Sequence, residues 1–490
     1  MNPKSGTELL VEHFSQFRKN IVGIDARIPT PYGEKPLIYL DWTASGRLYG
    51  PIEKEISENI GRYVANTHTD TSFTGQYMTE LYHDALKKVK AHVKADEDYV
   101  LFQAGYGMTG AINKLQRLLG LRVHEKYRDQ ILRSMESRPV VFVSRLEHHS
   151  NHISWLETLA ETVLIPFDQN GFPDLTAFED LLKKYRSRPL YLSVSACSNV
   201  TGIEPDIKSL IRLVHLYGGR AFVDYACSAP YTDMDLSRNR METPDAIMFS
   251  PHKFLGGPGT GGILIMRKDL YQNTIPDEPG GGTVIWTDPW DGAVYLDDIE
   301  ARETGGTPGF LLLIKTALAV DLKEKMNTQK IRMREHDILN KLFKGLDAIK
   351  GVDILESTHR DRLGVVSVLT DNIPYYAVVR LLNDFFGIQT RGGCSCAGTY
   401  GHYLLDLDRE KSLKIKREIL EGKYDCKPGW TRISIHPTTS DEEVEKVLEG
   451  MEYVMNHGQK ILEKDYLLKN GQYVHKNFDY GKYIPSLEID

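Results

Sequence analysis

Short runs of apolar residues alternate with amphipathic stretches along most of the chain from residue 36 onward. The runs that predict buried strands are PLIYLD, YVLFQ, PVVFVS, VLIPF, LYLSVSA, RAFVDY and DAIMFS. Amphipathic segments such as TELYHDALKKVKAHV and IKSLIRLVHLYG lie between several of them. Continuous apolar runs separated by helices are typical of strands that are buried on both faces of a mostly parallel sheet. The pattern therefore predicts an α/β fold with a large sheet domain.

The pattern changes beyond residue 308, where a long helical stretch begins. It is followed by the strand-like runs VDILE, LGVVSVLT and TRISIH, with a helix near YYAVVRLLNDF. We interpret this region as a second, smaller α+β domain with which the first 35 residues pack. The predicted division is 36–308 for the large domain, 1–35 and 309–455 for the small domain, and 456–490 for a C-terminal extension.

Composition narrows the class of protein. The 490 residues are 41% hydrophobic and 26% charged, which is ample for a sizeable core. The net charge of -7 gives no electrostatic reason to expect nucleic acid or an anionic membrane as partner. Five cysteines are too few for a disulfide framework, and the odd number argues against full pairing. No signal peptide or membrane span is visible, so a cytoplasmic location is expected.

Two candidate groups follow predicted strands, where an open α/β sheet binds its ligand. Asp224 ends the run AFVD and is compatible with a cap, a ribose clamp, a metal ligand or the partner of a cofactor ring nitrogen. Lys253 closes Ser-Pro-His-Lys after the run AIMF, just before a glycine-rich turn. Ser250 and His252 beside it suit a Schiff-base lysine, although an exposed turn lysine would look the same.

Two further motifs follow predicted strands. Gly105-Tyr106-Gly107-Met108-Thr109-Gly110 enters a helix, where backbone N–H groups can hold a phosphate, but it is neither a Walker nor a good Rossmann motif. Glu147-His148-His149-Ser150-Asn151 follows VVFVS. Adjacent histidines diverge and lack a third ligand at metal-binding spacing, so no metal site is expected. Two interpretations of a single histidine in this motif remain open. It stacks on an aromatic cofactor, or it is an ordinary packed or solvated residue.

In this order, the motifs resemble the class V aminotransferase family of pyridoxal-phosphate enzymes, and within it the cysteine desulfurases and selenocysteine lyases. The resemblance covers about residues 36–450, and its most specific part is Ser-x-His-Lys with the upstream aspartate. It implies fold type I of the PLP-dependent transferases, with a seven-stranded, mostly parallel sheet and a smaller α+β domain. It also implies pyridoxal 5'-phosphate as cofactor and a homodimer with shared active sites.

The resemblance implies a role for each matching residue. Lys253 would bind the cofactor as a Schiff base and, with His148 as proton donor and ring-stacking partner, belong to the catalytic set. The other implied cofactor contacts are Asp224 to the ring nitrogen, Asn199 to the ring oxygen, Gly107, Met108, Thr109, Ser250 and His252 to the phosphate, and Thr283 to the phosphate of the partner subunit. Two residues depart from the family pattern: Cys227 replaces a glutamine, and Met108 replaces a threonine.

The segment Arg391-Gly392-Gly393-Cys394-Ser395-Cys396 resembles the desulfurase loop Arg-x-Gly-x-x-Cys. It implies Cys396 as the catalytic nucleophile and Arg391 near the substrate, while Arg432 matches the clamp for the substrate α-carboxylate. Cys394 is compatible with a second sulfur acceptor, a redox partner, a packed thiol or, with His402 or Cys426, half of a metal site. The loop also resembles that of molybdenum-cofactor sulfurases.

The resemblance therefore implies removal of sulfur from L-cysteine, giving alanine and an enzyme persulfide whose sulfur passes to an acceptor protein. An alternative is another reaction of the family on a small amino acid, namely transamination, epimerisation or β-elimination, in which the thiols are incidental. A third possibility is a non-catalytic protein that retains the fold. The intact Lys253 and Asp224 argue against this last alternative.

Overall fold

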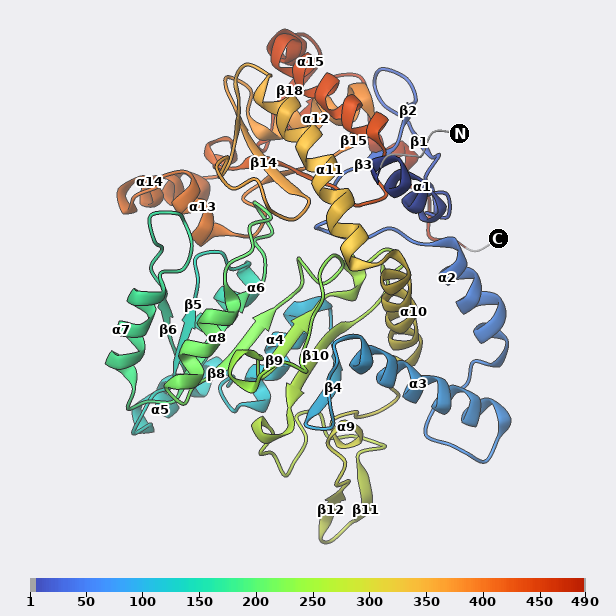
Figure 1. The fold of residues 1–490 in the computed structure, drawn as a ribbon, viewed down its shortest axis with the longest axis vertical. Helices are drawn as coiled ribbons and strands as arrows, with labels where there is room; N and C mark the ends of the chain where they lie inside the picture. The colour runs from blue at the N-terminus through green and yellow to red at the C-terminus, as the bar shows by residue number, and fades with distance from the viewer. Residues whose placement is uncertain (1–5, 489–490) are drawn as a thin grey trace. The chain divides into compact units, whose positions relative to one another are not determined.

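The computed structural model describes residues 6–488, which fall into two compact units (Figure 1). The large unit comprises residues 45–198 and 204–328, and the small unit comprises residues 1–44, 199–203 and 329–490. The short segment 199–203 thus belongs to the small unit, although residues of the large unit precede and follow it in the chain.

A seven-stranded sheet forms the centre of the large unit, with the strand order β4-β10-β9-β8-β7-β5-β6. Its strands are β4 (Tyr99–Ala104), β5 (Val140–Val143), β6 (Glu161–Leu164), β7 (Leu190–Ser195), β8 (Arg220–Asp224), β9 (Ala246–Phe249) and β10 (Gly262–Arg267). Neighbouring strands from β6 to β9 are parallel, whereas β10 is antiparallel to both β9 and β4. The predicted α/β class with a seven-stranded, mostly parallel sheet is confirmed.

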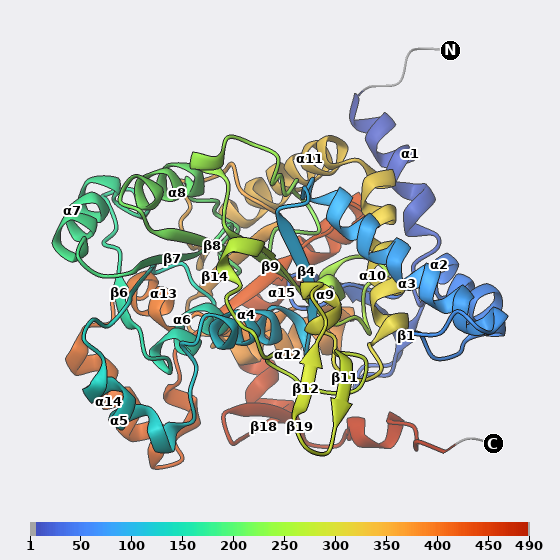
Figure 2. The same ribbon diagram turned by 90° about the horizontal axis from the view of Figure 1, so that it is seen from below.

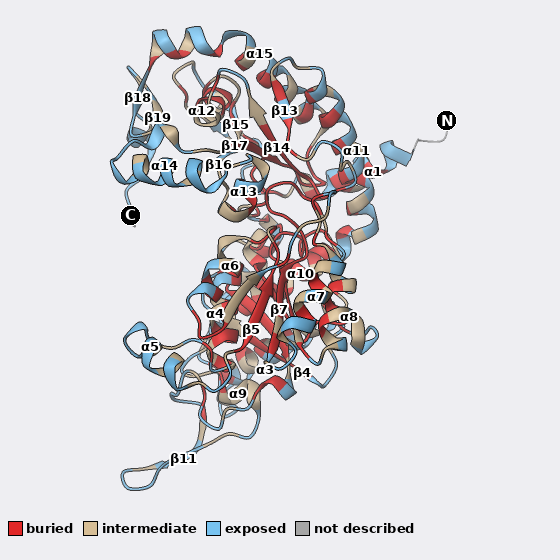
Figure 3. Cartoon of the chain, turned by 90° about the vertical axis from the view of Figure 1, so that its left-hand side faces the viewer, coloured by how far each residue is buried: buried red, intermediate tan, exposed pale blue. Residues whose placement is uncertain are grey.

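Helices cover both faces of this sheet because its strands are apolar on both sides. In β4, Leu101 packs into one core cluster, while Val100 and Phe102 pack into another. The first cluster also contains residues of α3 (Phe73–His92), α7 (Leu175–Tyr185), α8 (Ile207–Leu216) and α10 (Phe310–Met326). The second contains residues of α4 (Gly107–Leu118) and α6 (His149–Leu156). Figure 2 shows helices above and below the strands, and Figure 3 shows that burial concentrates in them.

Further elements of the large unit lie at the margins of these two layers. They are α2 (Gly50–Lys54), α5 (Glu125–Ser134), α9 (Ile299–Arg302), and a hairpin of β11 (Val284–Asp288) and β12 (Gly292–Tyr295). Helix α5 has no buried residue, so the polar stretch 120–139 contains a surface helix. The hairpin projects away from the sheet (Figure 1).

The small unit contains a four-stranded sheet with the order β13-β14-β17-β16. Its strands are β13 (Val352–Ile354), β14 (Val365–Thr370), β16 (Arg391–Gly393) and β17 (Trp430–Ser434). Its helices are α1 (Gly6–Arg18), α11 (Thr328–Asp347), α12 (Tyr375–Phe386), α13 (Gly398–Leu404), α14 (Arg409–Leu420) and α15 (Asp441–Asp465). Arg18 forms an ion pair with Glu443, which fixes the N-terminal helix to the start of α15. The capping box of Ser440 and Glu443 stabilises that start.

Three two-stranded sheets complete the small unit. Strand β3 (Ile38–Tyr39) pairs in parallel with β15 (Ile388–Gln389), and β18 (Tyr466–Lys469) pairs with β19 (Gln472–His475). A further two-residue pair joins β1 (Arg27–Ile28) to β2 (Lys35–Pro36). The buried Tyr466 hydroxyl donates to Asp384, so the C-terminal segment is anchored to α12.

Three details differ from the apolar pattern. The run PLIYLD forms only the two-residue β3 and lies in the small unit, because it pairs with β15 and not with the large sheet. The strand predicted at VLIPF ends at Leu164, two residues before Pro166, which has no N–H to donate to a strand partner. The long helical stretch divides at Asn327, whose φ of 68° ends α10 before α11 begins. No helix within residues 6–488 is long and apolar enough to cross a membrane.

Candidate active site

Asp224 lies at the carboxyl end of β8, near the middle of the seven-stranded sheet. Its side chain is 5% exposed, and Oδ1 accepts a hydrogen bond from the Ala226 N–H at 2.8 Å. Burial raises the pKa of Asp224 to about 6, against the effects of this hydrogen bond and of the nearby Lys253 charge. A buried carboxylate with so little compensation favours a cationic partner.

Lys253 follows β9 on a single 3-10 turn, Pro251–Lys253. Two glycines allow other backbone segments to approach this turn closely. A Cβ atom on Gly257 would lie 1.9 Å from the Pro251 carbonyl oxygen, and one on Gly46 would lie 2.0 Å from the Phe254 carbonyl oxygen. The Gly46 N–H also donates to the His252 carbonyl. Close backbone packing therefore fixes the position of the lysine main chain.

The glycine-rich turn meets the same segment at the start of α4. A Cβ atom on Gly107 would lie 2.9 Å from a ring carbon of His252 and 3.0 Å from the Ser250 Oγ, and the φ of Gly107 is 58°. The Met108 N–H donates to Ser250 Oγ at 2.8 Å, while the methionine side chain is buried in the core. Burial, followed by the Lys253 charge, lowers the pKa of His252 to about 4. The structure thus brings Gly107, Met108, Ser250 and His252 together around a helix N-terminus.

His148 caps α6, and its Nδ1 accepts a hydrogen bond from the Ser150 N–H at 3.1 Å. In the neutral ring, this hydrogen bond places the proton on Nε2. Ser150 Oγ lies 2.6 Å from Thr109 Oγ1, which links this helix start to that of α4.

Glu147, next to His148, is almost completely buried in a polar network. Its carboxylate accepts hydrogen bonds from Ser144, Asn151 and Ser195. Burial raises the pKa of Glu147 to about 7, although each of these hydrogen bonds lowers it. The network fixes the backbone from which His148 extends, so Glu147 supports the candidate site from within the core.

The large-unit residues fit pyridoxal phosphate on their own geometry. The buried Asp224 can pair with a protonated ring nitrogen, which is the usual partner of such a carboxylate. The N-terminus of α4, with Ser250 and His252 against Gly107, provides donors for a phosphate. Lys253 follows His252 on the same turn, and its charge acts on Asp224.

The second group of predicted residues lies in the small unit. Strand β16 pairs with β17 so that Arg391 is directly opposite Arg432. Immediately after β16, the Ala397 N–H donates to the Cys394 carbonyl, and the two residues between them have positive φ angles, 51° for Ser395 and 56° for Cys396. Positive φ at both central positions is typical of a type I′ turn and costs non-glycine residues about 1–2 kcal/mol each. Cys396 is exposed in this strained turn.

Ser395 holds the turn in place. Its carbonyl accepts a hydrogen bond from Asn199 Nδ2 at 2.7 Å, and its Oγ accepts one from Trp430 Nε1 at 3.1 Å. Asn199 Oδ1 is buried and has no hydrogen-bond partner in the described structure. Asn199, predicted to contact the cofactor, is therefore also attached to the thiol turn.

Both predicted substrate arginines bind one carboxylate, that of Asp41. Arg391 approaches it with Nε at 2.9 Å and Nη2 at 2.8 Å, and Arg432 approaches with Nη2 at 2.8 Å. The pKa of Arg391 is raised, first by the hydrogen bond to Asp41 and to a smaller extent by the charges of Asp41, Tyr39 and Cys396. Arg432 Nη1 donates to the Asn199 carbonyl.

The other cysteines have different surroundings. Cys197 and Cys227 are buried, and both thiols point to the carbonyl of Ser198. Cys394 lines an apolar pocket of about 300 Å³ between α13 and α14. No disulfide links any of the five cysteines. Within residues 6–488, no three His, Cys, Asp or Glu side chains are grouped as metal ligands would be.

Thr283 lies in the loop before the β11–β12 hairpin, and its hydroxyl donates to the Gly280 carbonyl at 2.6 Å. The side chain is buried within its own loop, so its predicted phosphate contact with a partner subunit stays a prediction. Beyond it, the hairpin exposes Ile285, Trp286 and Trp290, the last of which is 85% exposed.

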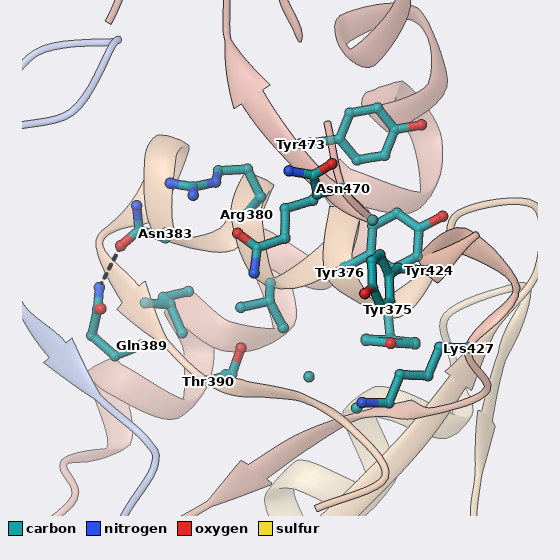
Figure 4. A pocket seen from close by; sticks show the side chains of 16 residues that line it. Tyr375, Tyr376, Arg380, Asn383, Gln389, Thr390, Tyr424, Lys427, Asn470 and Tyr473 are labelled. Carbon is teal, nitrogen blue, oxygen red and sulfur yellow. Dashed lines mark hydrogen bonds between the residues drawn. The ribbon is translucent and has the colours of Figure 1, made fainter. Parts of the chain in front are cut away.

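A further pocket of about 520 Å³ lies in the small unit beside β16 (Figure 4). Tyr375 and Tyr376 of α12 line it together with residues 470–473 of the C-terminal hairpin, and Gly392 and Gly393 of β16 contribute to its wall. Neither Arg391 nor a cysteine lines this pocket. The C-terminal extension thus forms one side of a cavity next to the strand that leads to the thiol turn.

Sequence reasoning missed Asp41 and Glu147 as supporting residues. Asp41 ends the run LIYL as Asp224 ends AFVD, so the strand-end rule was sufficient to find it. Glu147 is adjacent to the histidines of its motif, but nothing in the sequence indicates its burial.

Comparison with known proteins gives a consistent result. The profile of the class-V aminotransferase family matches residues 38–447. A probable cysteine desulfurase of Halalkalibacterium halodurans is 26% identical over 367 residues, covering 74% of this chain and 84% of that protein. A probable cysteine desulfurase of Streptomyces coelicolor is 24% identical over 426 residues, covering 86% of this chain and 92% of that protein. The apo cysteine desulfurase of Thermococcus onnurineus NA1 superposes with a TM-score of 0.72 at 23% identity, covering 90% of this chain and 98% of that one.

Proposed function

The chain belongs to the class-V aminotransferase family, and from this premise we propose that it is a pyridoxal-phosphate-dependent cysteine desulfurase. In this reaction L-cysteine, or its selenium analogue, loses its chalcogen and leaves as alanine. The observation that carries the proposal is the position of Cys396 on an exposed turn that directly follows β16, the strand on which Arg391 lies opposite Arg432. The relatives named as probable cysteine desulfurases support the same reaction.

When bound, pyridoxal phosphate supplies an electron sink for the bond-breaking steps at the substrate amino acid. Asp224 would hold the proton of the ring nitrogen, and the α4 N-terminus with Ser250 and His252 would hold the phosphate. Lys253 Nζ would be the base that removes the Cα proton, and His148 would contact the ring and donate a proton.

The small unit supplies the sulfur chemistry. Arg432 and Arg391 bind the α-carboxylate, and Cys396 attacks the substrate sulfur as a thiolate. The Cβ–S bond breaks as the S–S bond forms, and the released electron pair takes up a proton at Cβ. The proton that Lys253 removed is returned to Cα, which gives alanine. The sulfur remains on Cys396 as a persulfide, and a thiol-bearing acceptor protein removes it.

We further propose a homodimer. Its support is the β11–β12 hairpin, where Ile285 is 61%, Trp286 63% and Trp290 85% exposed. Monomers rarely expose such a group of large apolar side chains, and aromatic residues are enriched in interfaces. Replacing Trp286 and Trp290 together by arginine is expected to convert a dimer to a monomer in sedimentation velocity. An unchanged mass would contradict this use of the hairpin. The cytoplasmic location stays a prediction.

The reaction is tested by incubating the purified holoenzyme with L-cysteine and measuring alanine and sulfide in the presence of a reducing thiol. We expect Cys396→Ser to lower turnover on the order of a hundredfold or more, because the nucleophile is lost. Cys394→Ser, the matched variant two residues away, is expected to stay within about threefold of the unmodified enzyme. If both variants keep full turnover, another reaction of the family is favoured and the thiols are incidental.

A further inference from the structure

Asp41 is held rigidly against the small-unit sheet. The Ser434 N–H donates to the Leu40 carbonyl, and the Thr43 N–H donates to Ser434 Oγ. Between these bonds, Trp42 stacks on the buried His436 with ring centroids 4.2 Å apart. The Asp41 carboxylate is therefore fixed by the backbone on both sides of it and by a stacked aromatic pair.

The charges around Asp41 do not balance. Two guanidinium groups meet one carboxylate, and Asp41 is the only acidic residue within ion-pair distance of either arginine in the described chain. Arg432 is 3% exposed, and its Nε is buried without a hydrogen-bond partner. A buried donor left without an acceptor costs about 1–3 kcal/mol. The Arg391 side chain is 49% exposed, so solvent reaches its charge, whereas the Arg432 Nε is a buried donor that the ion pair does not use.

We propose that Asp41 is a positioning residue that also determines substrate charge: it holds Arg391 and Arg432 together and neutralises one of their two charges, so that the pair accepts amino acids with one carboxylate and disfavours those with a second anionic group. This inference rests on the proposed function, because it takes the two arginines as the binding site of the α-carboxylate. A second anionic group would face the fixed negative charge of Asp41 without a cation of its own.

The ligand pair that tests this is L-asparagine and L-aspartate, which have nearly the same shape and differ by one charge. Their affinities for the holoenzyme are measured by isothermal titration calorimetry, which requires no turnover. We expect the unmodified protein to bind L-asparagine at least about tenfold more tightly than L-aspartate. Asp41→Asn removes the charge but keeps the size of the side chain. In this variant we expect the ratio to fall at least about tenfold, because L-aspartate now meets two unneutralised guanidinium groups.

Asp353→Asn serves as the control, because Asp353 is exposed on β13 in the same unit. It should leave the affinity ratio unchanged, and Asp41→Glu, which keeps the charge, should retain most of it. Equal binding of the two ligands by the unmodified protein would overturn the proposal, and this measurement stands even if Asp41→Asn fails to fold. Selectivity that persists in a folded Asp41→Asn protein would also overturn it.

The result is separable from the proposed function. Neither ligand carries sulfur, so a protein that releases no sulfide from L-cysteine can still show the charge selectivity. Conversely, if the protein is an active desulfurase that binds both ligands equally, the proposed function is supported and the role proposed for Asp41 is contradicted.

Discussion

The two groups of candidate residues are built on opposite principles. In the large unit, Asp224 and Lys253 lie at the ends of buried strands, and glycines such as Gly257 allow tight backbone contacts around them. In the small unit, Cys396 lies on an exposed, strained turn at the end of a short edge strand. One group is fixed by packing, and the other is held by a few hydrogen bonds and ion pairs.

This difference matches the two tasks proposed for them. A cofactor ring must be held in one geometry throughout the reaction, which requires preorganised groups with little freedom. A thiol that receives sulfur and then passes it on must be accessible first to the substrate and then to the acceptor protein. Strain at Ser395 and Cys396 is balanced by the hydrogen bonds from Asn199 and Trp430, so the turn has a defined resting position at limited stability.

The largest expected effect separates the two groups by substitution of one residue in each. Lys253→Ala is expected to remove the near-visible absorption of the cofactor and to lower turnover at least roughly a thousandfold, because both the attachment point and the base are lost. Cys396→Ser is expected to lose turnover and retain the absorption. Absorption spectra and alanine release measure the two properties independently.

Lys268→Ala, on the exposed surface of the large unit, is the control for Lys253→Ala and should change neither property. Loss of the absorption in Cys396→Ser would contradict the separation of the two groups. So would a Lys253→Ala protein that keeps its spectrum.

The buried group could be predicted from sequence to a greater extent than the exposed one. Asp224 and Ser250 follow long apolar runs that leave little choice about strand position, so their placement at one edge of the sheet follows from the parallel topology. The run PLIYLD has the same apolar character as the runs that form the large sheet, yet it forms only β3 in the small unit. Local periodicity indicates that a segment is buried, but it does not indicate which partner strand buries it.

The thiol region shows the same limit at the level of single residues. The sequence motifs identify Arg391 and Arg432 separately as candidate substrate-binding residues, but they do not indicate that the two are paired. That pairing depends on the register of β16 and β17. Their shared partner, Asp41, lies 350 positions before Arg391 in the chain. Long-range ion pairs of this kind leave no periodic signal, and the pocket beside β16 likewise requires a hairpin from the C-terminal segment.

A smaller effect is expected from a substitution that disturbs packing around Lys253 without touching its side chain. A Cβ atom on Gly257 would lie 1.9 Å from the Pro251 carbonyl oxygen, so Gly257→Ala must displace the turn that carries the lysine. We expect the free energy of unfolding to fall by about 1–3 kcal/mol and cofactor affinity to fall with it. Chemical denaturation and titration of the apoprotein with pyridoxal phosphate measure the two effects.

Gly6→Ala, where an added methyl group meets no atom within 4 Å, is the control and should change neither quantity. If Gly257→Ala binds the cofactor as tightly as the unmodified protein, the packed group is more tolerant than its contacts indicate. The contrast with the thiol turn would then be weaker.

The last expected effect concerns the pH dependence of stability and tests the buried group of residues. Because the pKa of Glu147 is raised from 4.5 to about 7, the folded protein holds a proton there that the unfolded chain has lost. This contribution to stability is complete below pH 4.5 and is lost as the pH rises to 7, at up to about 1.4 kcal/mol per pH unit.

Glu147→Gln removes this pH-dependent contribution. The free energy of unfolding of the variant, relative to that of the unmodified protein, should therefore rise between pH 5 and 7, whereas the exposed Glu136→Gln should run parallel to the unmodified protein. If the unfolding free energies of Glu147→Gln and of the unmodified protein change in parallel with pH, the Glu147 carboxylate is ionised in the folded protein over this range. The buried core next to His148 would then accommodate a negative charge.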